Sequence, residues 1–303
     1  IVKYYRSYKD ITGAFTLNEK LKNTCYNYKP DMIVLGHCDL INAQQLGQLR
    51  EDYPNIKIAQ WFLDPLNKHG PDFERNKKRI LDKSEFVDAN FLTTSPDVLK
   101  FLPNNVKNFF IPNPVDDSLE TLNNFNNPCS VDVFFALSHG VHRGVLKRGK
   151  FDSREIFIDK LQKIVPNIKF DLYGMKNNQP IWADNFINAL SKSKMGLNLS
   201  QGRALKYYSS DRFAQLIGNG LLVLVDEKTK FNHFLNKNEI ITYKNLNDLA
   251  EKITKYSNND KLRKKIAKRG RDKYFKYFNS SLVAEFIVNR TFGINKKKYY
   301  WER

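Results

Sequence analysis

The densest group of residues that could do chemistry runs from Ser138 to Lys150. These thirteen residues include two histidines, two arginines, two lysines and three glycines. Glycine lets backbone N–H groups approach an anion, and arginine presents a planar fork that fits phosphate oxygens. We therefore predict a binding loop for a phosphate-bearing ligand, with an ordinary exposed basic turn as the alternative. The candidate residues are Ser138, His139, Gly140, His142, Arg143 and Lys147, of which Arg143 and Lys147 are the strongest.

A second polar cluster lies between residues 200 and 212, and it leads into a predicted helix. Lys206 and Arg212 offer positive charge there, and Tyr207 or Tyr208 could stack on a base, although such aromatic pairs also suit a core. The serines and aspartate directly before the helix are natural N-cap residues, so capping alone is the alternative. The candidates are Ser200, Lys206, Tyr207, Ser209, Ser210, Asp211 and Arg212, joined by Tyr173 and Gly174 at the end of another predicted strand.

A third set of candidates stands in the first third of the chain. His37 and Asp39 follow one predicted strand, and Asp64 follows the next. Either residue type could take a proton from a hydroxyl group, and a carboxylate could instead act as a nucleophile. Each residue also has a purely structural explanation, because Asp64 precedes a proline as turn residues do and His37 could be a partly buried, hydrogen-bonded imidazole.

Several motifs are absent from the sequence. It has no G-x-x-x-x-G-K-[ST] phosphate loop, no G-x-S-x-G turn and no G-x-G-x-x-G, which argues against the corresponding NTPases, hydrolases and dehydrogenases. Histidines and cysteines do not fall at the spacings of metal ligands, and there is no Asp-x-Asp triplet. We expect neither a structural metal nor a resident cofactor.

The elements that must position these residues alternate along the chain. Short apolar runs predict strands at 32–35, 56–62, 91–94, 109–111, 131–137, 168–173, 195–199, 221–225 and 239–242. Helical patterns lie near 43–51, 74–83, 153–164, 183–193, 211–218, 247–257 and 260–277. Buried strands separated by helices indicate doubly wound parallel sheets, which bind ligands at the carboxyl ends of their strands.

The chain divides at a proline-containing segment, Ile111–Asp117, followed by an asparagine-rich stretch. We predict an α/β protein with two Rossmann-like domains that face a cleft. The first domain spans 1–113, the linker 114–130, the second domain 131–285 and a basic, aromatic tail 286–303. The first domain shows about four strands and the chain starts at Ile1, so we expect an amino-terminal piece to be missing.

Composition limits the classes of binding partner. The 303 residues carry a net charge of +18, and residues 244–303 hold 17 Lys and Arg against 6 Asp and Glu. Such a charge suits nucleotides, phosphorylated sugars, nucleic acid or an anionic membrane surface, although it also fits the solvated face of a helix. Three cysteines indicate a reducing compartment rather than a disulfide scaffold. No apolar run approaches the length of a membrane-spanning helix.

The order of the elements resembles the two-domain GT-B glycosyltransferases, and more narrowly their group 1 and CgeB/YkvP-like branch. The resemblance covers residues 108–290 and rests on Ile-Pro-Asn-Pro-Val-Asp at 111–116, the strand and basic loop after it, Phe-Asp-Leu-Tyr-Gly at 170–174, Met-Gly-Leu-Asn-Leu-Ser at 195–200 and the glycine-ended helix and strand at 212–225. It implies a nucleotide-sugar donor in the second domain and an acceptor on the first.

One departure from the family affects the donor. Retaining members often carry two glutamates eight residues apart, and the matching positions here hold Tyr207 and Gln215. Glutamine can still hydrogen-bond a ribose hydroxyl, but it lacks the charge. Gln215 therefore joins the donor-binding candidates, and an acidic sugar on CMP, of the Kdo type, becomes an alternative donor.

The sequence thus predicts a metal-independent glycosyltransferase that uses a nucleotide sugar and a glycan or lipid-linked acceptor to build a bacterial surface polysaccharide such as lipopolysaccharide. We expect it in the cytoplasm, peripherally at the inner face of the plasma membrane. Two alternatives stay open at this point. One is a basic nucleic-acid-binding protein, and the other is a GT-B module that binds a glycan without transferring it.

Overall fold

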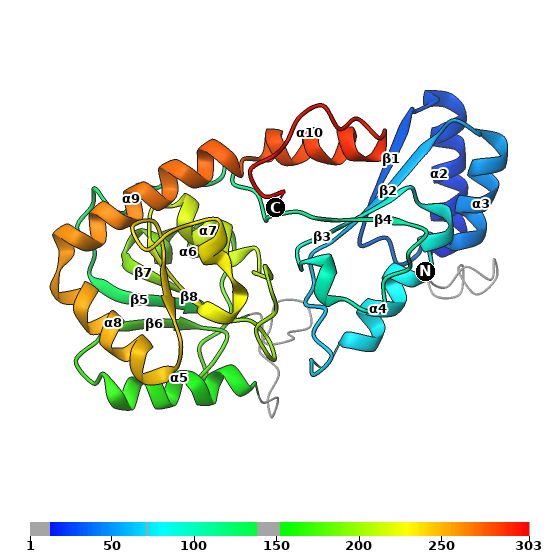
Figure 1. Ribbon diagram of the computed structural model, residues 1–303. Helices are drawn as coiled ribbons and strands as arrows, with labels where there is room; N and C mark the ends of the chain where they lie inside the picture. The colour runs from blue at the N-terminus through cyan, green and yellow to red at the C-terminus, as the bar shows by residue number, and fades with distance from the viewer. Residues whose placement is uncertain (1–12, 71, 138–151, 303) are drawn as a thin grey trace. The chain divides into compact units, whose positions relative to one another are not determined.

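The computed structural model describes residues 13–70, 72–137 and 152–302. They form two compact units, each built around a parallel sheet (Figure 1). Unit 1 comprises Ile1–Ile111 and the returning segment Ala284–Lys298, and unit 2 comprises Pro112–Val283 and Tyr299–Arg303. The chain therefore crosses from one unit to the other more than once.

Unit 1 contains a four-stranded sheet in the order β1-β2-β3-β4. Every neighbouring pair is parallel, and Gly36 at the end of β1 lies opposite Trp61 near the end of β2. The carboxyl ends of these strands therefore meet at one edge of the sheet. Its strands are β1 (Met32–Gly36), β2 (Lys57–Phe62), β3 (Ala89–Leu92) and β4 (Lys107–Phe110), and its helical segments are α2 (Ala14–Tyr28), α3 (Ala43–Asp52), α4 (Phe73–Leu81), η1 (Ser84–Phe86) and η2 (Pro96–Val98).

Unit 2 contains a five-stranded parallel sheet in the order β6-β5-β7-β8-β9. The order reverses at β5, which is the arrangement that places ligands outside the carboxyl ends of strands. Its strands are β5 (Val131–Ala136), β6 (Phe170–Tyr173), β7 (Ser193–Asn198), β8 (Leu222–Asp226) and β9 (Ile241–Tyr243). Its helical segments are α5 (Ser153–Ile164), α6 (Ala183–Ser191), α7 (Arg212–Gly218), η3 (Glu227–Thr229), η4 (Phe231–His233), α8 (Leu246–Asn258) and α9 (Asp260–Tyr277), followed by α10 (Ser280–Thr291), which enters unit 1.

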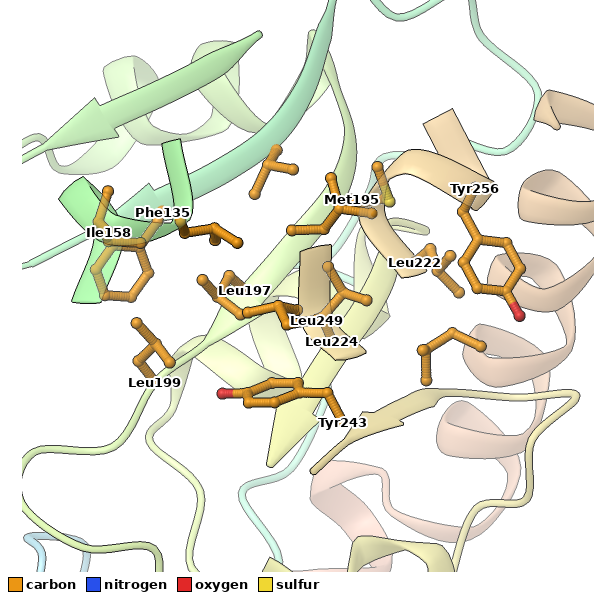
Figure 2. Packing of buried hydrophobic residues seen from close by; sticks show 14 of the residues in the cluster. Phe135, Ile158, Met195, Leu197, Leu199, Leu222, Leu224, Tyr243, Leu249 and Tyr256 are labelled. Atoms are coloured by element: carbon orange, nitrogen blue, oxygen red, sulfur yellow. The ribbon is translucent and has the colours of Figure 1, made fainter. Parts of the chain in front are cut away.

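Helices cover both faces of the unit 2 sheet. Side chains at alternate strand positions, such as Phe135 and Leu197, pack with Ile158 of α5 and Leu249 of α8 (Figure 2). The intervening position in β5, Phe134, points to the other face and meets Phe186 of α6 edge to face at 5.4 Å. Because both faces are covered, a central strand such as β8 reads as a continuous apolar run, Leu-Val-Leu-Val at 222–225, rather than an alternating one.

The structure confirms the α/β class and the two parallel sheets. Each of the nine predicted strands lies within two residues of an observed one at either end, and all seven predicted helices are present. In the part of the chain that the structure describes, the α-helices α2 and α10 were not predicted. Residues 112–130, expected as a separate linker, belong to unit 2, where Val115 and Phe125 are buried. The expected tail is divided, since residues 286–298 belong to unit 1 and 299–303 to unit 2.

Candidate functional site

The three candidates of unit 1 lie together at the carboxyl ends of β1 and β2. His37 Nδ1 is 3.7 Å from Oδ2 of Asp64. Nη1 of Arg79, on α4, lies 3.3 Å from the same Asp64 oxygen, and its Nη2 lies 2.5 Å from Oδ2 of Asp39. The arginine therefore joins the two carboxylates, and one of them faces the imidazole. We refer to His37, Asp39, Asp64 and Arg79 as the unit 1 cluster.

Packing fixes the imidazole of His37. Its ring stacks on Phe62 with centroids 4.9 Å apart and an interplanar angle of 11°. Its backbone has a φ of +47°, in the left-handed region that non-glycine residues adopt rarely and mostly at turns or functional sites. The preceding Gly36 allows the two strand ends to approach, because a β-carbon there would fall 2.1 Å from Nε1 of Trp61. The side chain is about one-third exposed, so a ligand can reach it.

The arrangement suits general-base chemistry. An imidazole that takes a proton from a hydroxyl becomes a cation, and a facing carboxylate stabilises that cation and holds the ring. Asp64 occupies that position, while Arg79 holds Asp64 from the other side. The sequence pattern indicated the histidine and both aspartates but not Arg79, whose signal was only its place in the basic helix after the second strand.

Unit 2 has a cavity of about 260 Å³ at the carboxyl ends of its strands. Asp211, Arg212 and Gln215, all predicted from the sequence, line it beside Ala136 at the end of β5. The loop before α6 contributes Trp182, whose side chain is half exposed. The remaining lining residues are Leu137, Pro180, Ile181, Ala183 and Phe186.

Arg212 supplies the positive charge of this cavity. Its guanidinium lies over the ring of Phe135 at 5.0 Å, and Nη1 donates a 3.5 Å hydrogen bond to the carbonyl oxygen of Leu199. Among the described residues no carboxylate lies within ion-pair distance of it. Burial, and then the charge of Arg154, lowers the pKa of Arg212 to about 10, so the side chain still carries its charge at neutral pH. It is thus a cation placed to receive an anionic ligand.

A second, smaller cavity of about 180 Å³ adjoins the ends of β7, β8 and β9. Ser200, another predicted residue, lines it together with Arg154 near the start of α5. Asp152 caps that helix, accepting from the backbone N–H of Arg154 and pairing with its guanidinium at 2.6 Å. The helix that follows the basic loop therefore begins where the sequence predicted. The other lining residues are Ser153, Phe157, Leu199, Gly202, Ala204, Asp226 and Tyr243.

The structure gives packing roles to part of the second cluster. Tyr207 is buried, its hydroxyl lies 2.9 Å from Nδ1 of His233, and Lys206 Nζ sits 4.9 Å over its ring. Ser209 is also buried, and its carbonyl and hydroxyl accept from the side chain of Asn113. These contacts hold the loop against the rest of unit 2 and keep the Tyr207 ring buried.

Local geometry corrects the capping prediction. The helix α7 starts after Asp211, whose side chain makes no capping hydrogen bond, and the Ser210 hydroxyl instead donates to Oδ1 of Asn198.

The backbone at Gly174 requires a glycine. Gly174 follows β6 with a φ of +69°, and a β-carbon there would lie 1.8 Å from the carbonyl oxygen of Leu137. Only glycine fits that approach. The neighbouring Tyr173 is partly buried and donates to Asp171.

Six predicted donor-binding residues lie outside the described residues. They are Ser138, His139, Gly140, His142, Arg143 and Lys147, so their role stays a prediction. In the described ranges, no group of three or more His, Cys, Asp and Glu side chains is placed to hold a metal ion. In the same ranges, no helix is both long enough and apolar enough to cross a membrane.

Comparison with solved structures shows the class of fold. Anabaena HepE, solved with UDP and glucose, aligns with a TM-score of 0.62 at 12% identity over 93% of this chain and 83% of its own. A Rickettsia africae glycosyltransferase aligns with a TM-score of 0.54 at 15% identity over 94% and 82%. TarM aligns with a TM-score of 0.57 at 15% identity over 86% of this chain, which spans about half of TarM (54%). The fold is therefore GT-B, as predicted.

A family model narrows the class further. Residues 153–289 match the family described as glycosyl transferase-like. The matched range includes α5 to α9 and the residues of unit 2 that line both cavities after residue 152. No curated protein matches the chain. The fold and the family model together support the predicted glycosyltransferase class, and they leave the group 1 and CgeB/YkvP-like branch a prediction.

Proposed function

We propose that this chain is a glycosyltransferase that moves a sugar from a nucleotide-sugar donor to a glycan or lipid-linked acceptor. The larger cavity of unit 2 carries the proposal. It lies at the carboxyl ends of a parallel sheet, and all of its lining residues except Ala136 and Leu137 fall in the range that matches a glycosyl transferase-like family. It presents Arg212 with no carboxylate within ion-pair distance among the described residues. A departing nucleoside phosphate needs such a positive charge, and an arginine can supply it without a metal.

The two units would divide the reaction between them. Arg212 would contact the phosphate of the donor, Gln215 a ribose hydroxyl, and the exposed ring of Trp182 offers a face on which a base can stack. In unit 1, His37 would take the proton of the acceptor hydroxyl while Asp64 stabilises the resulting imidazolium. The acceptor oxygen would then form the new bond to the anomeric carbon, and the nucleotide would leave with the electron pair of the broken bond.

The proposal extends to the biological role, the location and the donor sugar. We infer a role in bacterial surface polysaccharide synthesis, with the enzyme in the cytoplasm and peripheral to the membrane. We keep CMP-linked Kdo as an alternative donor. Gln215 supports that alternative, because a neutral side chain in this cavity does not repel an acidic sugar as a glutamate would. HepE and one structure of TarM were solved with UDP, so UDP sugars are the donors to compare against it.

A nucleotide panel tests the proposal. Thermal unfolding is followed with CMP, UDP and GDP, each at millimolar concentration, and a bound nucleotide raises the unfolding temperature by mass action. Stabilisation by CMP and not by UDP would support the acidic-sugar donor, and the reverse would support a UDP sugar. If none of the nucleotides stabilises the protein, the proposed enzyme activity is wrong.

One other function has a specific observation in its favour. Gln215 lines the cavity where related enzymes often carry a glutamate, which fits a GT-B module that binds a glycan without transferring sugar. A hydrolysis assay over a panel of nucleotide sugars separates the two. A transferase releases nucleotide slowly from its donor even without acceptor, whereas a binding module releases none.

A further inference from the structure

The helix α10 and the turn after it expose an apolar surface in unit 1. Ala284 and Val288 lie one turn apart on the same side of the helix, Phe292 follows in the turn with its backbone N–H bonded to the carbonyl oxygen of Val288, and all three are exposed. Ile294 extends this line into the turn and is 44% exposed, as is Val288. Single exposed apolar residues are ordinary on protein surfaces, but a continuous line of them is not.

The opposite side of α10 is already occupied. Phe286 is buried and meets Phe91 of β3 and Phe109 of β4 edge to face, at 5.8 and 5.7 Å. On the outward side, Ala284 and Val288 are exposed beside Glu285, which pairs with Lys297. The helix therefore exposes apolar side chains in addition to those that pack on the sheet of its own unit. An amphipathic surface helix carries mainly polar residues where it faces outward. The apolar residues of α10, continued past its end by Phe292 and Ile294, are therefore a candidate binding surface.

The buried side chain of Arg290 holds the turn that follows α10 in one conformation. Arg290 is buried, its guanidinium donates to the carbonyl oxygens of Ile294 and Lys297 at 2.6 and 2.7 Å, and it lies over the ring of Phe286. Gly293 has a φ of +74°, which lets the helix end and the chain reverse there. Buried hydrogen bonds to the backbone thus fix how the apolar residues and the segment after them are presented.

Lysines surround the apolar line. Lys296, Lys297 and Lys298 follow it directly and are exposed, and Lys107 of β4 reaches the turn, with Nζ 3.9 Å from the place of a β-carbon on Gly293. Lys297 also pairs with Glu285. Nucleic acid would satisfy the lysines but would leave the apolar side chains unused. A bilayer with anionic headgroups satisfies both, because apolar residues enter the acyl boundary and lysines stay among the phosphates.

We propose that this surface, the α10 patch, docks unit 1 onto an anionic lipid bilayer. The apolar residues Val288, Phe292 and Ile294 would enter the interface, and Lys107, Lys296 and Lys298 would contact the headgroups. This inference deepens the peripheral location suggested above by naming the surface responsible, and it is independent of whether sugar is transferred. Its failure would leave the nucleotide test unaffected.

Vesicle sedimentation tests the proposal on the full chain. The vesicles are pure phosphatidylcholine or phosphatidylcholine mixed with phosphatidylglycerol, whose negative headgroups attract basic segments. We expect binding only to the anionic vesicles. Each lysine near such a surface raises the membrane partition coefficient roughly fivefold. The double variant K296Q/K298Q should therefore bind about 25-fold more weakly. The variant F292S/I294S should lose about tenfold, because the buried apolar area is removed while the charge is kept.

Matched controls separate the α10 patch from general charge and apolarity. K261Q/K265Q removes two exposed lysines from α9 in unit 2, and V98S removes an exposed apolar side chain elsewhere in unit 1. Neither should change binding more than twofold. Far-UV circular dichroism and thermal unfolding establish that each variant is folded.

Three results would overturn the proposal. The first is no binding of the wild-type protein to anionic vesicles. The second is an equal loss of vesicle binding in K261Q/K265Q and K296Q/K298Q, or no loss in F292S/I294S. Either result would mean that the net charge of the protein, and not the α10 patch, explains the binding. The third is a self-associated species in light scattering that F292S/I294S converts to monomer, which would assign the patch to a second copy of this chain.

Discussion

The candidate sites of the two units differ in how their charges are paired. In the unit 1 cluster, Arg79 forms ion pairs with both Asp39 and Asp64, which leaves a net negative charge beside His37. In the larger cavity of unit 2, Asp211 also lines the wall, but no described carboxylate lies within ion-pair distance of Arg212. Paired charges beside an imidazole suit the positioning of a proton acceptor, whereas a cation without an ion pair suits the binding of an anion. The difference predicts that the two sites fail in different ways when mutated.

The largest effect should come from His37. We expect His37→Asn to lower kcat about 10²- to 10⁴-fold, the usual contribution of a general base, while the Kd for nucleotide stays within about twofold. Asparagine tolerates the left-handed backbone of this position, so the fold should survive. Steady-state kinetics and calorimetric nucleotide binding measure the two quantities.

Asp39→Asn is the matched control for His37. Asp39 belongs to the same cluster but contacts Arg79 rather than the imidazole. We expect a loss in kcat below about fivefold, since only the arginine loses a partner. An Asp39→Asn variant as impaired as His37→Asn would show that the cluster serves the structure and not proton transfer.

The gathering of the unit 1 cluster was predictable in part, for a topological reason. The ends of β1 and β2 meet because neighbouring parallel strands finish at the same edge, so the residues that follow them were expected there. Arg79 was not, because its contact depends on how the helix α4 is set against the strand ends. No pattern in the sequence fixes that rotation.

The lining of the unit 2 cavity shows the same division. Arg212 could be found because it stands at the start of a predicted helix after a predicted strand, and Gln215 because the family resemblance places a glutamate at its position. Trp182 could not be predicted as a lining residue. The loop before it includes Lys176 and Asn177 in the left-handed backbone region, and no turn motif in the sequence indicates that conformation. The helix α10 was not predicted for another reason. It has both buried and exposed apolar residues, so its sequence lacks the periodic apolar stripe on one face that marks a surface helix.

The second effect should come from Arg212 and should appear in binding. We expect Arg212→Met to weaken nucleotide binding about 10- to 100-fold, because a hydrogen bond to a charged group contributes about 1.5–3 kcal/mol. Methionine keeps much of the apolar contact with Phe135. Calorimetric titration with the nucleotide that stabilises the wild-type protein measures the change.

Lys228→Ala is the charge-matched control, because Lys228 is exposed on η3 and does not line the larger cavity. It should change nucleotide affinity less than twofold. Equal losses in both variants would mean that net charge, and not the cavity, attracts the nucleotide. An Arg212→Met variant that binds normally but transfers sugar slowly would erase the contrast between the units.

The smallest effect concerns a feature that the units share. Near the starts of neighbouring strands, each unit has an aspartate whose Oδ2 accepts a backbone N–H: Asp88 from Ile58 at 2.8 Å, and Asp132 from Lys169 at 2.9 Å. Burial alone would raise the pKa of each carboxyl group. Hydrogen bonds and nearby cations outweigh it, so the pKa of both aspartates is lowered.

A lowered pKa in the folded state has a definite sign. The stabilisation is fully present above the unfolded pKa of about 4 and is lost as pH falls through the folded pKa. We expect Asp88→Asn and Asp132→Asn each to cost about 1–2 kcal/mol at pH 7, and the gap from wild type to narrow at pH 3. Thermal unfolding at the two pH values measures this. Hydrogen exchange locates it, because Asp88→Asn should speed exchange of the Ile58 amide and not that of Lys169, and Asp132→Asn the reverse. If either substitution accelerates both amides equally, the units do not unfold independently, and the contrast between their sites could not be assigned to separate parts of the chain.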